Sequence, residues 1–163
     1  MLLDRLFLNT TEKFPDNIAV VHGDMRISYS EMYSRASKLV AVLQEYGIRQ
    51  GDRVLIALEN SAEYITSYFA TLLAGGVTVA INPDVKHIGL QKIVLDCKPF
   101  CIIARSSMLP LIETCGRTHA FGCILLFGKR ESNGMDDSAP VYIDEGIRHE
   151  KVSALDKNKN RPS

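Results

Sequence analysis

Apolar stretches and amphipathic stretches alternate along most of the chain. Four short apolar runs bounded by polar or turn residues predict buried strands at residues 53–58, 77–81, 100–104 and 122–127. In the segments between these strands, apolar residues recur at the spacing of a helical face. Strands that alternate with helices form β-α-β units. The pattern therefore predicts an α/β fold, a mostly parallel sheet with helices on both faces.

The N-terminal part adds a hairpin and a helix after a short amphipathic start. Residues 18–22 and 25–28 are predicted as two strands joined by a Gly-Asp turn. Ser28 and Glu31 have the spacing of a capping box, which predicts the start of a helix. Gly47 is the expected C-terminal stop of that helix.

The helix predicted after residue 60 has two different faces. Asn60 and Glu63 repeat the capping spacing at its start. Large apolar side chains share one broad face, and the other face is small enough for close packing as well. The large residues are Tyr64, Ile65, Tyr68, Phe69, Leu72 and Leu73, and the small ones are Ala62, Ser67, Ala70, Thr71 and Ala74.

The character of the chain changes near Lys129. Residues 129–138 are polar and rich in turn formers, which predicts a surface loop, and residues 141–143 predict a short edge strand. Residues 156–163 contain no apolar side chain and are predicted to be mobile. We therefore divide the chain into an α/β subdomain at 1–128 and a polar loop with a mobile tail at 129–163.

Charge and hydropathy limit the function classes. With 19 basic and 19 acidic side chains, the formal net charge is zero, so we expect no nucleic-acid partner. Asp4 and Arg5 interrupt the apolar start, which does not resemble a secretory signal. No apolar run approaches the length of a transmembrane segment. The expectation is a soluble protein in the cytoplasm or another intracellular compartment.

The sequence offers no recognisable catalytic or metal-binding motif. The cysteines at 97, 101, 115 and 123 lack the close pairs of zinc sites and lie in apolar runs, so we predict buried, reduced thiols. The histidines at 22, 87, 119 and 149 show no paired ligand spacing. There is no G-x-G-x-x-G, and residues 122–129, the nearest approach to a phosphate loop, are better explained as a strand end. We name no catalytic, cofactor-binding or metal-binding residue.

Five segments, in order, resemble the N-terminal region of the adenylate-forming (AMP-binding) superfamily. That superfamily includes acyl-CoA synthetases, coumarate-CoA-ligase-like and luciferase-like enzymes, and peptide-synthetase adenylation domains. The resemblance covers roughly residues 1–127 of this chain. The segments are 14–20 (FPDNIAV), 27–32 (ISYSEM), 47–54 (GIRQGDRV), 59–64 (ENSAEY) and 72–83 (LLAGGVTVAINP).

The resemblance implies an ATP-dependent ligase that joins a carboxylic acid to AMP and usually passes the acyl group to a thiol such as coenzyme A. The family's Ser/Thr/Gly-rich phosphate loop ending in Lys has no match here. We therefore expect an N-terminal fragment of such a ligase, catalytically inactive by itself and without a cofactor of its own, whereas the full enzyme would use Mg-ATP and coenzyme A. The acid substrate stays open.

Two other hypotheses remain. The chain could be a stand-alone, non-catalytic α/β module derived from such a ligase, in which self-association or a partner chain covers an exposed apolar face. It could also be an unrelated flavodoxin-like or Rossmann-like nucleotide binder. The missing phosphate loop argues against the last hypothesis.

Overall fold

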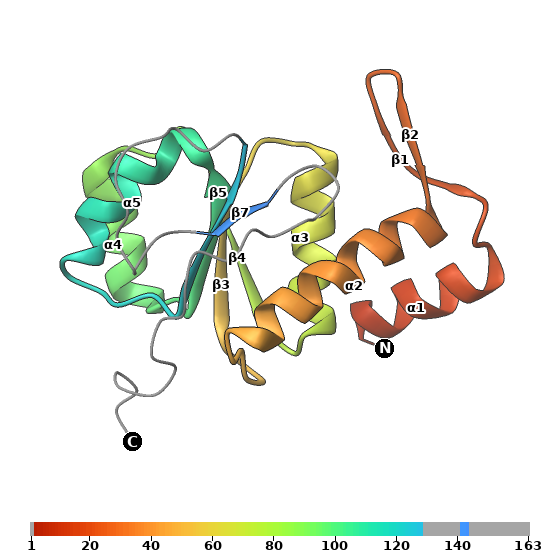
Figure 1. Ribbon diagram of the computed structural model, residues 1–163, viewed down its shortest axis with the longest axis horizontal. Helices are drawn as coiled ribbons and strands as arrows, with labels where there is room; N and C mark the ends of the chain where they lie inside the picture. The colour runs from red at the N-terminus through yellow and green to blue at the C-terminus, as the bar shows by residue number, and fades with distance from the viewer. Residues whose placement is uncertain (1, 129–140, 144–163) are drawn as a thin grey trace.

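A five-stranded parallel sheet with helices on both faces makes up most of the computed structural model, which describes residues 2–128 and 141–143 (Figure 1). The strand order is β4-β3-β5-β6-β7. The predicted α/β fold is confirmed. The elements are α1 (Leu3–Lys13), β1 (Ile18–His22), β2 (Met25–Ser28), α2 (Tyr29–Glu45), β3 (Arg53–Ala57), α3 (Ala62–Leu73), β4 (Val77–Ala80), α4 (His87–Cys97), β5 (Cys101–Arg105), a 3-10 turn (Ser106–Met108), α5 (Leu109–Gly116), β6 (Cys123–Phe127) and β7 (Val141–Ile143).

The predicted strands are present, with ends that differ by one residue. β3 and β4 each end one position earlier than expected, and β5 and β6 each begin one position later. The predicted edge strand is β7, which pairs in parallel with β6. The loop predicted at 129–138 and the tail predicted at 156–163 lie outside the described residues.

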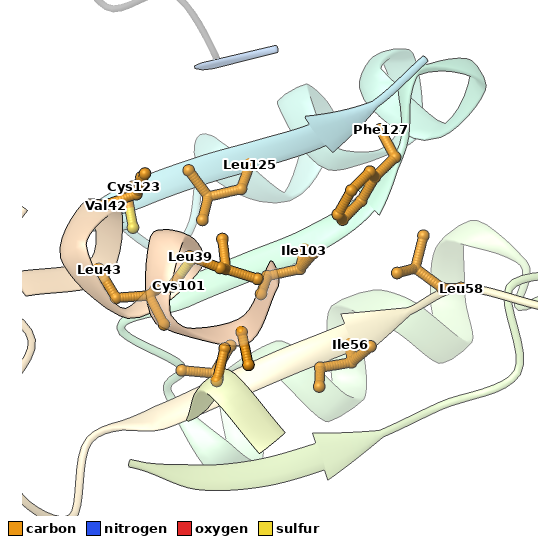
Figure 2. Packing of buried hydrophobic residues seen from close by; sticks show 13 residues of the cluster. Leu39, Val42, Leu43, Ile56, Leu58, Cys101, Ile103, Cys123, Leu125 and Phe127 are labelled. Carbon is orange, nitrogen blue, oxygen red and sulfur yellow. The ribbon is translucent and has the colours of Figure 1, made fainter. Parts of the chain in front are cut away.

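Alternation along the central strands gives the sheet two buried faces. Ile56, Cys101, Ile103 and Leu125 point to the face that α2 and α3 cover (Figure 2), and Val54 belongs to the same cluster. Their neighbours in sequence point to the opposite face, against α4 and α5 (Figure 1). Because both faces are apolar, the strands read as continuous hydrophobic runs in the sequence.

A third, smaller apolar cluster joins the hairpin and α1 to the helical layer. The predicted hairpin is confirmed, with β1 and β2 antiparallel. It projects beyond α1 and α2, away from the main sheet (Figure 1). Phe7 of α1 is buried, and its ring stacks on Phe69 of α3 with centroids 4.3 Å apart.

The cap predicted for α2 is present. Ser28 Oγ accepts a hydrogen bond from the Glu31 amide at 3.2 Å, and the Glu31 carboxylate bonds Arg35 at 2.7 Å. Gly47 follows the helix with φ +82°, a conformation that glycine adopts without a steric penalty. The predicted C-terminal stop is therefore confirmed.

Helix α3 differs from the prediction at its cap. The capping residue is Ser61, whose Oγ accepts from the Tyr64 amide at 3.2 Å, so the prediction of Asn60 was wrong by one position. The small face of α3 is the one that is fully buried, because small side chains let the helix approach the sheet closely. The large face is half-buried. The buried residues are Ala62, Thr66, Ser67, Ala70 and Thr71.

Among the described helices, none is both long and apolar enough to cross a membrane.

Candidate functional site

The carboxyl ends of β3 and β4 open onto a pocket of about 440 Å³. In parallel α/β sheets, ligands bind in crevices beyond this edge, because the loops and helix N-termini there present polar groups. The pocket is lined by Leu58, Glu59, Asn60, Tyr64, Ala80, Ile81, Asn82, Pro83 and Asp84. We call this the carboxyl-edge site.

One wall of the carboxyl-edge site is a turn after β4. Asn82 Oδ1 accepts from the Asp84 amide at 2.9 Å, and the Asn82 carbonyl accepts from the Val85 amide at 3.1 Å. Asn82 therefore uses its side chain and its backbone to fold the turn. Just before the turn, the Ile81 amide bonds the Ile56 carbonyl at 3.0 Å and holds this wall against β3.

The opposite wall is the loop between β3 and α3, where the charged groups gather. Arg105, at the end of β5, has its Nη2 atom 3.9 Å from a carboxylate oxygen of Glu59 and 3.9 Å from one of Glu63. The Glu59 side chain is 69% exposed and the Glu63 side chain 18%. The single positive charge of Arg105 thus balances at most one of the two negative charges, and the three side chains together keep a net negative charge.

Glu63 is ionised more readily than an ordinary glutamate. Its burial disfavours the charged form, but hydrogen bonds from its own amide and from Ser61, together with the positive charges of Arg105 and His22, outweigh burial and lower its pKa. The carboxylate at the start of α3 also faces the positive end of the helix dipole. Glu63 is therefore a fixed negative group at the rim of the site.

The chemistry of the carboxyl-edge site is that of a polar binding surface. Its amide side chains, Asn60 and Asn82, can donate and accept hydrogen bonds, and its charged side chains, Glu59 and Asp84, are both acidic. Within residues 2–128 and 141–143, no group of three or more His, Cys, Asp or Glu side chains could hold a metal ion. The site can position a polar ligand but offers no metal centre.

The residues considered in the sequence are dispersed. His22, His87 and His119 lie on β1, at the start of α4 and after α5. The His119 Nε2 atom is 2.7 Å from the Pro99 carbonyl, which is a structural contact. His149 lies outside the described residues. All four cysteines are free in the structure; burial is confirmed for Cys101, Cys115 and Cys123, whereas Cys97 is only half-buried.

The sequence analysis assigned a binding role to none of the residues of the carboxyl-edge site; Asn60 and Tyr64 entered it only as parts of a helix. A usable signal was present, because Glu59, Asn82 and Arg105 directly follow or end three apolar runs. The ends of parallel strands meet at one edge of a sheet, so polar residues at these positions converge.

A comparison with protein families decides the classification. The profile described as AMP-binding enzyme matches residues 7–158, which is nearly the whole chain. The chain belongs to the AMP-binding enzyme family. This confirms the resemblance to the adenylate-forming superfamily that the five sequence segments indicated.

Curated relatives of this AMP-binding family member include ligases and peptide synthetases. It is 30% identical over 108 residues to a long-chain-fatty-acid--CoA ligase of Bacillus subtilis, covering 66% of this chain and 19% of the ligase. It is 31% identical over 112 residues to tyrocidine synthase 2 of Brevibacillus parabrevis, covering 69% of this chain and 3% of the synthase. The chain thus spans only a small part of these relatives.

Solved structures show the same fold. The luciferase-like enzyme from the nonluminescent Zophobas morio mealworm matches with a TM-score of 0.72 and 24% identity, over 78% of this chain and 31% of that one. ATP-bound MatB from Rhodopseudomonas palustris matches with a TM-score of 0.68 and 22% identity, over 91% of this chain and 27% of that one. In each case the fold of this chain corresponds to one portion of a larger enzyme.

Proposed function

We propose that the chain is the N-terminal α/β portion of an ATP-dependent carboxylic acid ligase. Such an enzyme joins a carboxylate to AMP, using Mg-ATP, and usually transfers the acyl group to a thiol such as coenzyme A. The observation that carries the proposal is the family match over residues 7–158. The likeness to a fatty-acid–CoA ligase favours an acyl-CoA synthetase over a peptide-synthetase module only weakly, because a peptide synthetase matches about as well.

Residues 1–163 by themselves do not catalyse adenylation under this proposal. Transfer of a nucleotidyl group needs positioned cations and donors around the phosphates. The carboxyl-edge site does not fit a triphosphate, because Arg105 is already shared by two carboxylates and Asp84 adds a further negative charge. We therefore assign no step of the reaction to residues of this chain.

The role proposed for this chain is architectural. Its sheet and helices support the loops at the carboxyl edge, which contribute a wall of a ligand pocket completed by other parts of the ligase. We place the enzyme in the cytoplasm or another intracellular compartment, with a small carboxylic acid as substrate and no nucleic-acid partner.

A stand-alone, non-catalytic module is the second candidate. It is favoured by apolar side chains that lie exposed on α1, on the hairpin and near them, where another protein surface could cover them. Self-association or a partner chain would fill that role. The residues are Leu2, Leu3, Leu6, Phe14, Ile18, Val21 and Met25.

Two measurements test the proposal. Endogenous protein captured with an antibody to residues 1–127 is expected to have an intact mass several times the 18.1 kDa of this chain. That longer product should catalyse carboxylate-dependent exchange of pyrophosphate into ATP, and the 163-residue chain should not. A panel of fatty, aromatic and amino acids in the same assay identifies the substrate class.

Each outcome points to one hypothesis. A product of 18.1 kDa alone, without exchange activity but with a defined partner, would favour the stand-alone module. Exchange by the 163-residue chain would overturn the assignment of an architectural role.

A further inference from the structure

Two cysteines lie side by side on adjacent strands. Cys101 begins β5 and Cys123 begins β6, and the two are register partners in the parallel pairing. Neighbouring strands lie about 4.8 Å apart, and the α-carbons of a disulfide lie about 4.4 to 6.8 Å apart. The pairing therefore places both cysteines at a distance that a disulfide can bridge.

Both thiols point to the same side of the sheet. Both belong to the apolar cluster beneath α2, which gathers the side chains on that face of the sheet. Figure 2 shows Cys101 and Cys123 on neighbouring strands, within the cluster that also contains Val42 of α2. The β-carbon directions thus agree with the spacing of the α-carbons.

The sheet separates this pair from the other two cysteines. Cys115 belongs to the cluster on the opposite face, and Cys97 packs against that same cluster. Neither can reach Cys101 or Cys123 while the sheet is intact. A bond formed by the pair would therefore be specific.

The two thiols differ in access. Cys123 is 5% exposed, whereas Cys101 is completely buried. Burial raises the pKa of Cys101 well above its usual value, and contact with Cys123 adds to this effect. A small oxidant entering at the amino end of β6 therefore meets Cys123 first.

Tyr46, at the C-terminal end of α2, packs against the apolar cluster that contains both cysteines. Its partial burial raises its pKa, and Cys123, Glu45 and Cys101 raise it further. The phenol stays protonated beside the thiols at neutral pH. Movement of this end of α2 would widen the access to Cys123.

We infer that Cys101 and Cys123 form a redox modification site, at which a hydroperoxide converts the thiol pair into an intrachain disulfide joining β5 to β6. The Cys123 sulfur attacks one oxygen of the hydroperoxide ROOH and the O–O bond breaks. The sulfur becomes a sulfenic acid, and the RO group leaves with the thiol proton as ROH, which is water when the oxidant is hydrogen peroxide. The Cys101 sulfur then attacks the sulfenic sulfur, and the sulfenic OH leaves with the Cys101 proton as water. Two thiols are oxidised and one peroxide is reduced.

The test uses the full 163-residue chain with hydrogen peroxide as the oxidant. Free thiols counted by alkylation after unfolding should fall from the four of the sequence to two. The intact mass should drop by about 2 Da, for two hydrogens lost. Peptide mapping should find a Cys101–Cys123 cross-link, and a dithiol reductant should restore all four thiols.

Matched variants separate this site from general oxidation. The double variant Cys97→Ser with Cys115→Ser should still lose both of its thiols. In Cys101→Ser, Cys123 should stop at the sulfenic acid, which a dimedone probe traps. If Cys101→Ser fails to fold, peptide mapping of the peroxide-treated chain without substitutions still shows whether Cys101 and Cys123 are joined. A cross-link involving Cys97 or Cys115, or sulfinic acid at Cys123 without any disulfide, would overturn the inference.

Discussion

The ring of Phe100 lies against the backbone of Gly122, so closely that a β-carbon added at Gly122 would be 2.1 Å from Cε2 of the ring. The Gly122 amide also donates to the Phe100 carbonyl at 2.7 Å. Phe100 directly precedes β5, and Gly122 directly precedes β6. This contact fixes where two neighbouring strands begin.

Gly122→Ala should destabilise the protein by about 1 to 3 kcal/mol, because the half-buried ring must move out of a packed position. The measurement is the free energy of unfolding in urea. Replacing Phe100 with Leu in the same chain should recover part of the loss, because the two substitutions act on one contact.

Gly116→Ala is the matched control for the glycine substitution. A β-carbon at Gly116, the last residue of α5, would meet no atom within 4 Å. Alanine favours helix over glycine, so this variant should be neutral or more stable by up to about 1 kcal/mol. Equal effects of the two substitutions would show that the Phe100 ring moves freely.

The cap of α3 is tested by two neighbouring substitutions. Ser61→Ala removes the oxygen that accepts from the Tyr64 amide and should cost about 1 kcal/mol of unfolding free energy. Asn60→Ala, one position earlier and exposed, should change stability by less than about 0.5 kcal/mol. The reverse order of effects would favour a cap at Asn60.

Ser67 is a buried polar residue that α3 presses against the sheet. Within the described part of the chain, its hydroxyl has no hydrogen-bond partner. Ser67→Ala should raise the free energy of unfolding by about 1 kcal/mol, because an unsatisfied buried hydroxyl carries its full desolvation cost. Thermal unfolding followed by circular dichroism measures the change.

Thr71→Val is the control for Ser67. Thr71 lies one turn after Ser67 on the same buried face of α3, but the Thr71 hydroxyl donates a hydrogen bond to the Ser67 carbonyl at 2.8 Å. Removing the Thr71 hydroxyl should leave the free energy of unfolding unchanged or lower it by up to about 1 kcal/mol. If Ser67→Ala and Thr71→Val lowered stability equally, the Ser67 hydroxyl would have a hydrogen-bond partner in solution, and the prediction would be wrong.

Glu63 makes a pH-dependent contribution to stability. Because its pKa is lowered in the folded state, the contribution is present above the ordinary value of 4.5 and is lost as the pH falls through the folded value. Glu63→Gln should therefore cost up to about 1 kcal/mol at neutral pH, since the ion pair with Arg105 is partly solvated. In acid, the free energies of unfolding of Glu63→Gln and of the chain without substitutions should become equal.

Urea unfolding across an acid-to-neutral pH series measures this difference. Glu113→Gln, at an exposed carboxylate of α5, is the control for the loss of one negative charge. A Glu63→Gln penalty that persisted unchanged at low pH would exclude the ionised carboxylate as its source.

Most of the fold was predictable because its strongest signals are local. The apolar runs of β3, β5 and β6 report strands buried on both faces, and Gly47 marks the end of a helix. The cap of α3 was misplaced because Asn60 and Ser61 are both good capping residues, and only the backbone geometry chooses between them.

The carboxyl-edge site was not predictable in the same way. Its charged cluster brings Glu59 and Glu63 together with Arg105, which lies on a different strand. That meeting depends on β5 pairing with β3, whereas β4 takes the edge position. Hydrophobic periodicity predicts the strands but contains no information about their order.

The strand order also has a consequence for synthesis on the ribosome. β3 lies between β4 and β5 in the sheet. The strand edge of β3 that pairs with β5 therefore stays unpaired until the ribosome has translated α4 and then β5. Domains fold as the chain emerges at about 5 to 20 residues per second. The nascent protein therefore carries an open, apolar strand edge for seconds, and in that interval a chaperone or a neighbouring nascent chain has its best opportunity to bind.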